Sequence, residues 1–118
     1  MKFSIVLKLA IVIIFFSGCA TTTPIQKYSE SISKFNVPPR LMSHNFSDND
    51  IYRNYQRAAT GFTSIESLRY DVEKRAELFA SRQNKSIIVL GERISEPPYI
   101  LGNFPRIEIV FALIDKKD

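Results

Sequence analysis

The sequence predicts a small α+β fold, in which one helix packs across an antiparallel sheet in the order strand, helix, strand, strand. This prediction depends on one amphipathic segment with the period of a helix and on two β-branched apolar runs with the length of strands. The chain has 118 residues, of which 45% are hydrophobic and 24% are charged. Such a chain forms one small globular domain and leaves no room for a second one.

The helix is predicted to begin at Thr63 and to end near Asn84. Thr63 and Glu66 form a capping box, in which the Thr63 hydroxyl accepts from the backbone N–H of Glu66 and the Glu66 carboxylate reaches back. Apolar side chains then recur at spacings of three and four, at Ile65, Leu68, Val72, Ala76 and Phe79. This stripe is the face that we expect to pack on the sheet.

The strands are predicted over residues 51–60, 86–90 and 107–114. The first mixes Tyr52 and Tyr55 with polar residues, which is compatible with a strand on a solvated sheet. In the last strand, Ile107, Ile109, Phe111 and Leu113 share one face, and Val110, Ala112 and Ile114 share the other. Because both of its faces are apolar, this strand is expected at the centre of the sheet.

The segment between the last two strands, residues 95–106, is longer than an ordinary hairpin loop and holds the candidate binding residues. These residues are Pro97, Pro98, Tyr99, Ile100, Leu101, Phe104 and Arg106. Prolines lower the entropy that is lost when a loop becomes ordered, and exposed apolar side chains are typical of a partner-binding loop. The same side chains could instead fold back over the open end of the sheet, and the sequence leaves both interpretations open.

Residues 1–18 have the pattern of a secretory signal peptide. Lys2 and Lys8 supply the positive charge, residues 9–16 are apolar, and two small residues follow. The apolar run is too short for a transmembrane helix, which needs about 20 residues. The chain is therefore expected to be exported and to lose this leader.

The four residues Phe16, Ser17, Gly18 and Cys19 resemble the lipobox of bacterial lipoproteins. In that family the cysteine becomes the first mature residue and carries three fatty chains, so the resemblance implies that Cys19 anchors the protein in a membrane. Cys19 is the only cysteine, and no disulfide can form within the chain. Ala20 follows it, which by the sorting rule of Gram-negative lipoproteins implies the periplasmic face of the outer membrane.

Residues 19–50 are predicted to form the lipidated N-terminus and a flexible linker, ahead of a folded module over residues 51–118. Thr, Ser, Asn and Pro are frequent in this segment, and three threonines before Pro24 favour an extended chain. A weak helical spacing relates four apolar residues, Ile25, Tyr28, Ile32 and Phe35. Such a stripe either packs on its own domain or docks on the membrane surface or on a partner.

We recognise no catalytic, metal-binding or cofactor-binding constellation in the sequence, and we therefore predict no enzyme and no cofactor. His44 is the only histidine, lies in the predicted linker and has no metal-ligand spacing around it. The four glycines are scattered and form no phosphate-binding loop. The formal charge is +4, and it falls to +2 without the two leader lysines. Such an exported chain is not expected to bind nucleic acid.

The layout of an acylated cysteine, a polar linker and a compact module resembles small uncharacterised lipoproteins of the enterobacterial outer membrane, and residues 55–115 are similar to one such group. This resemblance implies no known activity. One function class is a non-enzymatic interaction, sensor or assembly module that presents the long loop to another envelope protein. The alternative is a lipoprotein that binds a small apolar or cell-wall-derived molecule between helix and sheet. An enclosed apolar cavity would favour the ligand, whereas a filled core and an exposed loop would favour the protein partner.

Overall fold

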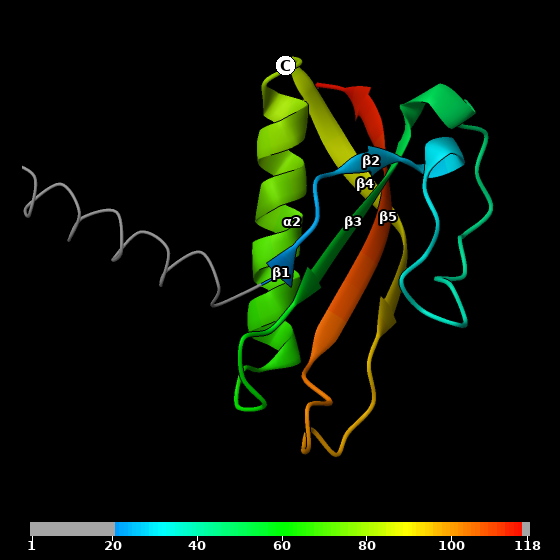
Figure 1. The fold of residues 1–118 in the computed structure, drawn as a ribbon. Helices are drawn as coiled ribbons and strands as arrows, with labels where there is room; N and C mark the ends of the chain where they lie inside the picture. The colour runs from blue at the N-terminus through cyan, green and yellow to red at the C-terminus, as the bar shows by residue number, and fades with distance from the viewer. Residues whose placement is uncertain (1–20, 117–118) are drawn as a thin grey trace, which may run out of the picture.

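The structure is a computed structural model that describes residues 21–116, and in it one helix packs on an antiparallel sheet (Figure 1). The predicted α+β class is confirmed. The elements are β1 (Thr21–Thr22), β2 (Gln26–Lys27), the 3₁₀ turns η1 (Tyr28–Glu30) and η2 (Asp48–Asp50), β3 (Ile51–Arg57), α2 (Ile65–Ser81), β4 (Lys85–Ile94) and β5 (Arg106–Asp115). The strand order is β1-β3-β5-β4, and β2 also pairs with β3.

Strand β5 lies between β3 and β4, as its two apolar faces predict. Ile109 of β5 lies opposite Asn54 of β3 and Glu92 of β4, in antiparallel register with both strands. The apolar side chains of β5 alternate between two clusters. The cluster that contacts the helix contains Ile107, Ile109, Phe111 and Leu113, and the cluster on the opposite face contains Val110 and Ala112.

Strand β4 is longer than the predicted run of residues 86–90 and continues to Ile94 through a bulge just before Gly91. The predicted strand ends where the apolar run ends. A Cβ at position 91 would lie 2.5 Å from the carbonyl oxygen of Arg40. The glycine therefore lets an earlier segment of the chain lie directly against β4 while the strand goes on.

Helix α2 begins one residue later than predicted, because Ser64 rather than Thr63 caps it. The Ser64 hydroxyl accepts from the backbone N–H of Ser67 at 3.1 Å, and Ser64 has the extended backbone of an N-cap residue. The predicted stripe is confirmed. The helix buries Leu68, Val72, Ala76 and Ala80 against the sheet, with Ile65 and Phe79 partly buried beside them.

Three aromatic rings lie at the centre of the core between the helix and the sheet. The ring centroids of Tyr52 and Phe79 are 4.9 Å apart, and the centroid of Tyr52 lies 5.9 Å from that of Phe111. Phe111 is fully buried. These contacts confirm the helix phase predicted from Phe79, and side chains fill the space between helix and sheet that a small ligand would need.

Residues 25–50 lie largely against the face of the sheet that is turned away from the helix, which differs from the expected flexible linker. Figure 1 shows most of this segment to the right of the sheet and α2 to its left. Tyr28, Leu41 and Phe46 pack on the second apolar cluster, and the weak helical stripe gives a short strand and a 3₁₀ turn instead of a helix. The physical reason is that the apolar second face of β5 needs a cover.

Candidate functional site

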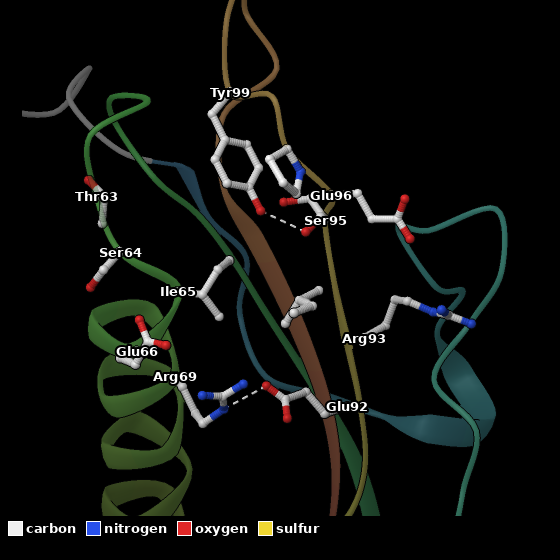
Figure 2. Close-up of a pocket in the computed structure, with 12 residues that line it drawn as sticks. Thr63, Ser64, Ile65, Glu66, Arg69, Glu92, Arg93, Ser95, Glu96 and Tyr99 are labelled. Atoms are coloured by element: carbon white, nitrogen blue, oxygen red, sulfur yellow. Dashed lines mark hydrogen bonds and ion pairs between the residues drawn. The ribbon is translucent and has the colours of Figure 1, made fainter.

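A hollow of about 700 Å³ lies between the first turns of α2 and the end of β4, and we call it the α2–β4 groove (Figure 2). Its apolar lining includes Ile65 from the helix, Ile94 from β4 and Tyr99 from the loop that follows β4. Ile94 is 38% exposed, although it lies at the end of a strand. The groove therefore leaves apolar surface of the sheet open to solvent, beyond the part that α2 covers.

Charged side chains of both signs border the α2–β4 groove. The Nε atom of Arg69 on the helix lies 2.7 Å from Oε1 of Glu92 on β4, and this ion pair joins the two elements at one end of the groove (Figure 2). Glu66 and Glu96 also line the groove, and both are exposed. The groove therefore combines apolar and charged side chains, as the surfaces that bind a protein segment do.

The border of the groove along β4 is an edge of the sheet. The backbone N–H of Ser95 donates to the carbonyl of Arg106 at 3.0 Å, so this pair is hydrogen-bonded across β4 and β5. Because hydrogen-bonded pairs alternate in an antiparallel ladder, the backbone groups of Glu92 and Ile94 point away from β5. Further along the strand, Met42 covers this edge. Its backbone N–H donates to the carbonyl of Leu90 at 2.9 Å.

The two interpretations that the sequence left open each describe part of the segment over residues 95–106, whose last residue begins β5. At its base, the side chains of three predicted binding residues fold back. The hydroxyl of Tyr99 donates to the carbonyl of Ser95 at 2.7 Å, the ring of Phe104 lies 5.1 Å from the Arg57 guanidinium carbon, and Arg106 lies over the ring of Phe35 at 5.3 Å. These residues stabilise the end of the sheet.

The tip of the same loop is exposed. Leu101 is 100% exposed and Ile100 is 61% exposed, and Pro97 and Pro98 are exposed as well. Composition alone could not separate Tyr99 and Phe104 from Ile100 and Leu101, because all four are large apolar side chains. The difference comes from partners elsewhere in the chain, such as Arg57, that the loop sequence does not contain.

A buried polar cluster, which no apolar pattern in the sequence predicts, lies on the sheet face opposite the helix. Glu108 of β5 is fully buried, and its Oε2 accepts from Nη1 of Arg53 at 2.9 Å and from the hydroxyl of Ser33 at 2.6 Å. Its Oε1 accepts from the backbone N–H of Lys34 at 2.8 Å. A lone glutamate in an apolar central strand is the signal that could have revealed this cluster, since such a charge must find partners.

The remaining contacts of the buried cluster show that its role is structural. Nε of Arg53 donates to the hydroxyl of Ser31 at 3.1 Å, and the guanidinium lies 4.8 Å from the ring centroid of Tyr28. Both carboxylate oxygens of Glu108 have donors within the chain. The cluster is therefore satisfied internally and holds residues 28–34 on the sheet.

His44 is the only histidine of the chain, and its contacts in the structure are local. Its Nδ1 accepts from the backbone N–H of Phe46 at 3.1 Å, and the two rings stack with centroids 5.8 Å apart. Within residues 21–116, no group of three or more His, Cys, Asp or Glu side chains is placed to hold a metal ion. Cys19, the predicted lipidation site, lies outside the described residues.

Comparison of the chain with models of protein families, with curated proteins and with solved structures found no match. Among the described residues 21–116, no helix has the length and apolar character needed to cross a membrane.

Proposed function

We propose that this chain is a lipid-anchored protein of the bacterial envelope that binds an extended segment of another envelope protein in the α2–β4 groove, without catalysis. The observation that carries this proposal is that the open space lies at the surface and not in the core between helix and sheet. Fully buried side chains such as Phe111, Ile109 and Val72 fill the region between helix and sheet, whereas the groove of about 700 Å³ is open at the surface.

An open groove favours a protein partner over a small ligand. Sites for small molecules bury most of the ligand surface in a concave, largely apolar cavity. The lining of the α2–β4 groove is mixed, with apolar residues such as Ile65 beside the charges of Glu66, Glu92 and Arg69. A polypeptide segment suits this mixed lining, because its apolar side chains can contact the apolar residues while its polar groups meet the charges.

The outer edge of β4 supplies the directional contacts for such a segment. Glu92 and Ile94 present backbone donors and acceptors next to the groove, and an extended peptide can pair with them as an added strand. Alternate side chains of that peptide then point to the same face, where Ile65 and Ile94 offer apolar surface. We therefore expect a partner segment with alternating apolar and polar residues.

The proposed location depends on the N-terminal residues. The resemblance of residues 16–19 to a lipobox supports acylation of Cys19 with palmitate-type chains, and Ala20 supports the periplasmic face of the outer membrane. At ~0.8 kcal/mol for each buried CH₂ group, multiple acyl chains make the attachment effectively permanent.

The substitution Cys19→Ala tests the anchor. We expect the full-length variant to move from the membrane pellet to the soluble fraction, because the acyl chains are lost. The measurement is cell fractionation with a high-salt wash, with Ser17→Ala as the matched control, which keeps a small residue before the cysteine. A Cys19→Ala protein that still sediments with the outer membrane would show that the anchor assignment is wrong.

Site-specific photocrosslinking in intact cells tests the binding site. A crosslinker at Glu96 lines the groove, whereas one at Glu77 is exposed on a different part of α2. We expect capture of a protein from position 96 only, and we expect Ile94→Lys to reduce that capture at least tenfold because a charge then replaces an apolar side chain of the groove. Equal capture by the wild-type chain and by the Ile94→Lys variant, at unchanged melting temperature, would contradict the groove as the site. A small molecule retained in native mass spectra would instead favour the ligand-binding alternative.

A further inference from the structure

Two loops at one end of the molecule, residues 58–64 and 97–105, contact each other, and we call this region the two-loop end (Figure 1). A Cβ at Gly61 would lie 2.5 Å from the carbonyl oxygen of Tyr99, so the glycine is what permits this approach. Nη2 of Arg57 also donates to the carbonyl of Gly102 at 3.2 Å. The two loops therefore form one continuous surface.

The two-loop end is apolar and uncharged. Phe62 and Leu101 are 100% exposed, Ile100 is 61% exposed, and neither loop contains an Asp, Glu, Lys or Arg residue. A single exposed apolar side chain is ordinary, but three large ones on two loops in contact mark an interaction surface. The charges that flank the loops in sequence are Arg57, Glu66, Glu96 and Arg106, and they balance.

The N-terminal chain reaches the sheet at this same end. Thr21 of β1 pairs with Arg57 of β3, and Arg57 pairs in turn with Arg106 of β5. These residues stand at the ends of the strands, where the two loops begin or finish. Cys19 precedes Thr21 by two residues, and consecutive Cα atoms are about 3.8 Å apart, so the Cα of Cys19 is within about 8 Å of the Cα of Thr21.

We propose that the two-loop end rests on the lipid bilayer, with Phe62, Ile100 and Leu101 in its interfacial region. This inference rests on the proposed lipid anchor at Cys19. An anchor within about 8 Å of β1 keeps this end of the domain at the membrane surface, so a bilayer is the apolar phase that these side chains meet at the highest effective concentration. The lipid anchor and the loops then fix the domain in one orientation.

The balanced charges around the two loops predict the type of contact. Attraction to anionic lipids needs clustered Lys and Arg, and this end has none in its two loops. Insertion therefore depends on apolar surface, and it is expected in neutral phosphatidylcholine as much as in anionic vesicles. It is also expected to persist in high salt, because screening weakens charge interactions only.

The absence of tryptophan from the chain makes a direct test possible. The full-length acylated protein with Leu101→Trp is reconstituted in phosphatidylcholine vesicles that contain brominated acyl chains, which quench indole fluorescence on contact. The matched control is Leu78→Trp. Leu78 is 58% exposed and lies near the other end of α2, about 20 Å along the helix axis from Ile65 at 1.5 Å per residue.

We expect the indole at position 101 to emit at shorter wavelength and to lose roughly half of its fluorescence, as for a side chain buried about 5–10 Å into the boundary, while position 78 remains unquenched. The result should not change when anionic lipid or salt is added. Protein that floats with the vesicles but shows equal, water-like emission at both positions would overturn the inference and leave the two-loop end to a protein partner. Protein that does not float at all would instead overturn the anchor of the proposed function.

Discussion

The two faces of the sheet are closed in different ways. On one face, helix α2 covers Ile107, Ile109 and Phe111 with the apolar stripe that the sequence displays. On the other face, residues 25–50 cover Val110 and Ala112 with one short strand, two 3₁₀ turns and irregular chain. A helix satisfies its own backbone and needs only apolar contact, whereas an irregular segment must find partners for its backbone groups one by one.

Glu108 supplies such partners on the second face. It accepts from the backbone N–H of Lys34 and from the side chains of Ser33 and Arg53. A buried carboxylate is costly without partners, but here three donors from two parts of the chain meet it. Buried apolar area therefore stabilises the helix face, whereas a few specific hydrogen bonds stabilise the opposite face. Substitutions on each face separate these two contributions.

The largest effect is expected on the second face, from Glu108→Ala. It leaves Arg53 buried without its carboxylate and removes the acceptor of the Lys34 amide, so we expect the free energy of unfolding to fall by about 3–5 kcal/mol. Urea unfolding followed by circular dichroism gives the value. Glu108→Gln is the control, since it keeps the shape and one acceptor and should lose less. Equal losses for Ala and Gln would mean that the charge, not the hydrogen bonds, holds the segment.

Phe79→Ala tests the helix face in the same assay. Phe79 contacts the rings of Tyr52 and Phe111 but is only partly buried, so we expect a loss of about 3 kcal/mol, at the low end for a core phenylalanine. Leu78→Ala, at the exposed neighbouring position, should change the stability by less than about 0.5 kcal/mol. An unfolding midpoint that Phe79→Ala leaves unchanged would refute the apolar account of this face.

A smaller effect is expected from the base of the long loop, at the edge of both faces. Tyr99→Ala together with Phe104→Ala should cost about 2 kcal/mol, because each ring is half-buried and the Tyr99 hydroxyl donates to the carbonyl of Ser95. Ile100→Ser with Leu101→Ser should cost almost nothing, since both side chains are exposed. If the second pair destabilised the purified domain as much as the first, the division of the loop into base and tip would be wrong.

The smallest effect concerns an exposed ion pair at the opposite end of the sheet. The hydrogen bond from Lys85 lowers the pKa of the Asp115 carboxyl. A lowered pKa in the folded state stabilises the protein above the unfolded value of about 4, and this contribution disappears as the pH falls through the folded pKa. Asp115→Asn should therefore lower the melting temperature slightly at pH 7 and not at all well below pH 4. A larger effect at low pH would reverse the assigned sign.

The sequence predicts correctly those elements in which apolar residues recur at the regular spacing of a helix or a strand. The stripe of α2 and the two apolar faces of β5 repeat at helical and strand spacing, so their partners did not have to be known. The cap was misplaced by one residue because Thr63 and Ser64 are both good N-cap residues. The tertiary fold gives Ser64 the extended backbone of an N-cap residue, and the sequence alone does not choose between these two neighbours.

The elements that the sequence did not predict depend on contacts between distant residues. Residues 25–50 have no strong period, and their place is set by Glu108 and by the close approach of Arg40 to Gly91, more than 50 positions apart in the chain. The α2–β4 groove was missed for the same reason. It needs β4 to continue past Gly91 to Ile94, and the bulge that allows this is not a pattern in the apolar residues.

The central claim is that residues 25–50 belong to the folded domain, where they cover the face of the sheet opposite helix α2. Amide hydrogen exchange at Lys34 and Met42 tests it most directly. These amides donate to Glu108 Oε1 at 2.8 Å and to the Leu90 carbonyl at 2.9 Å. The account predicts that both exchange within about tenfold of the Phe111 amide, through the same global opening. Exchange of both at the rate of an unstructured peptide would contradict it.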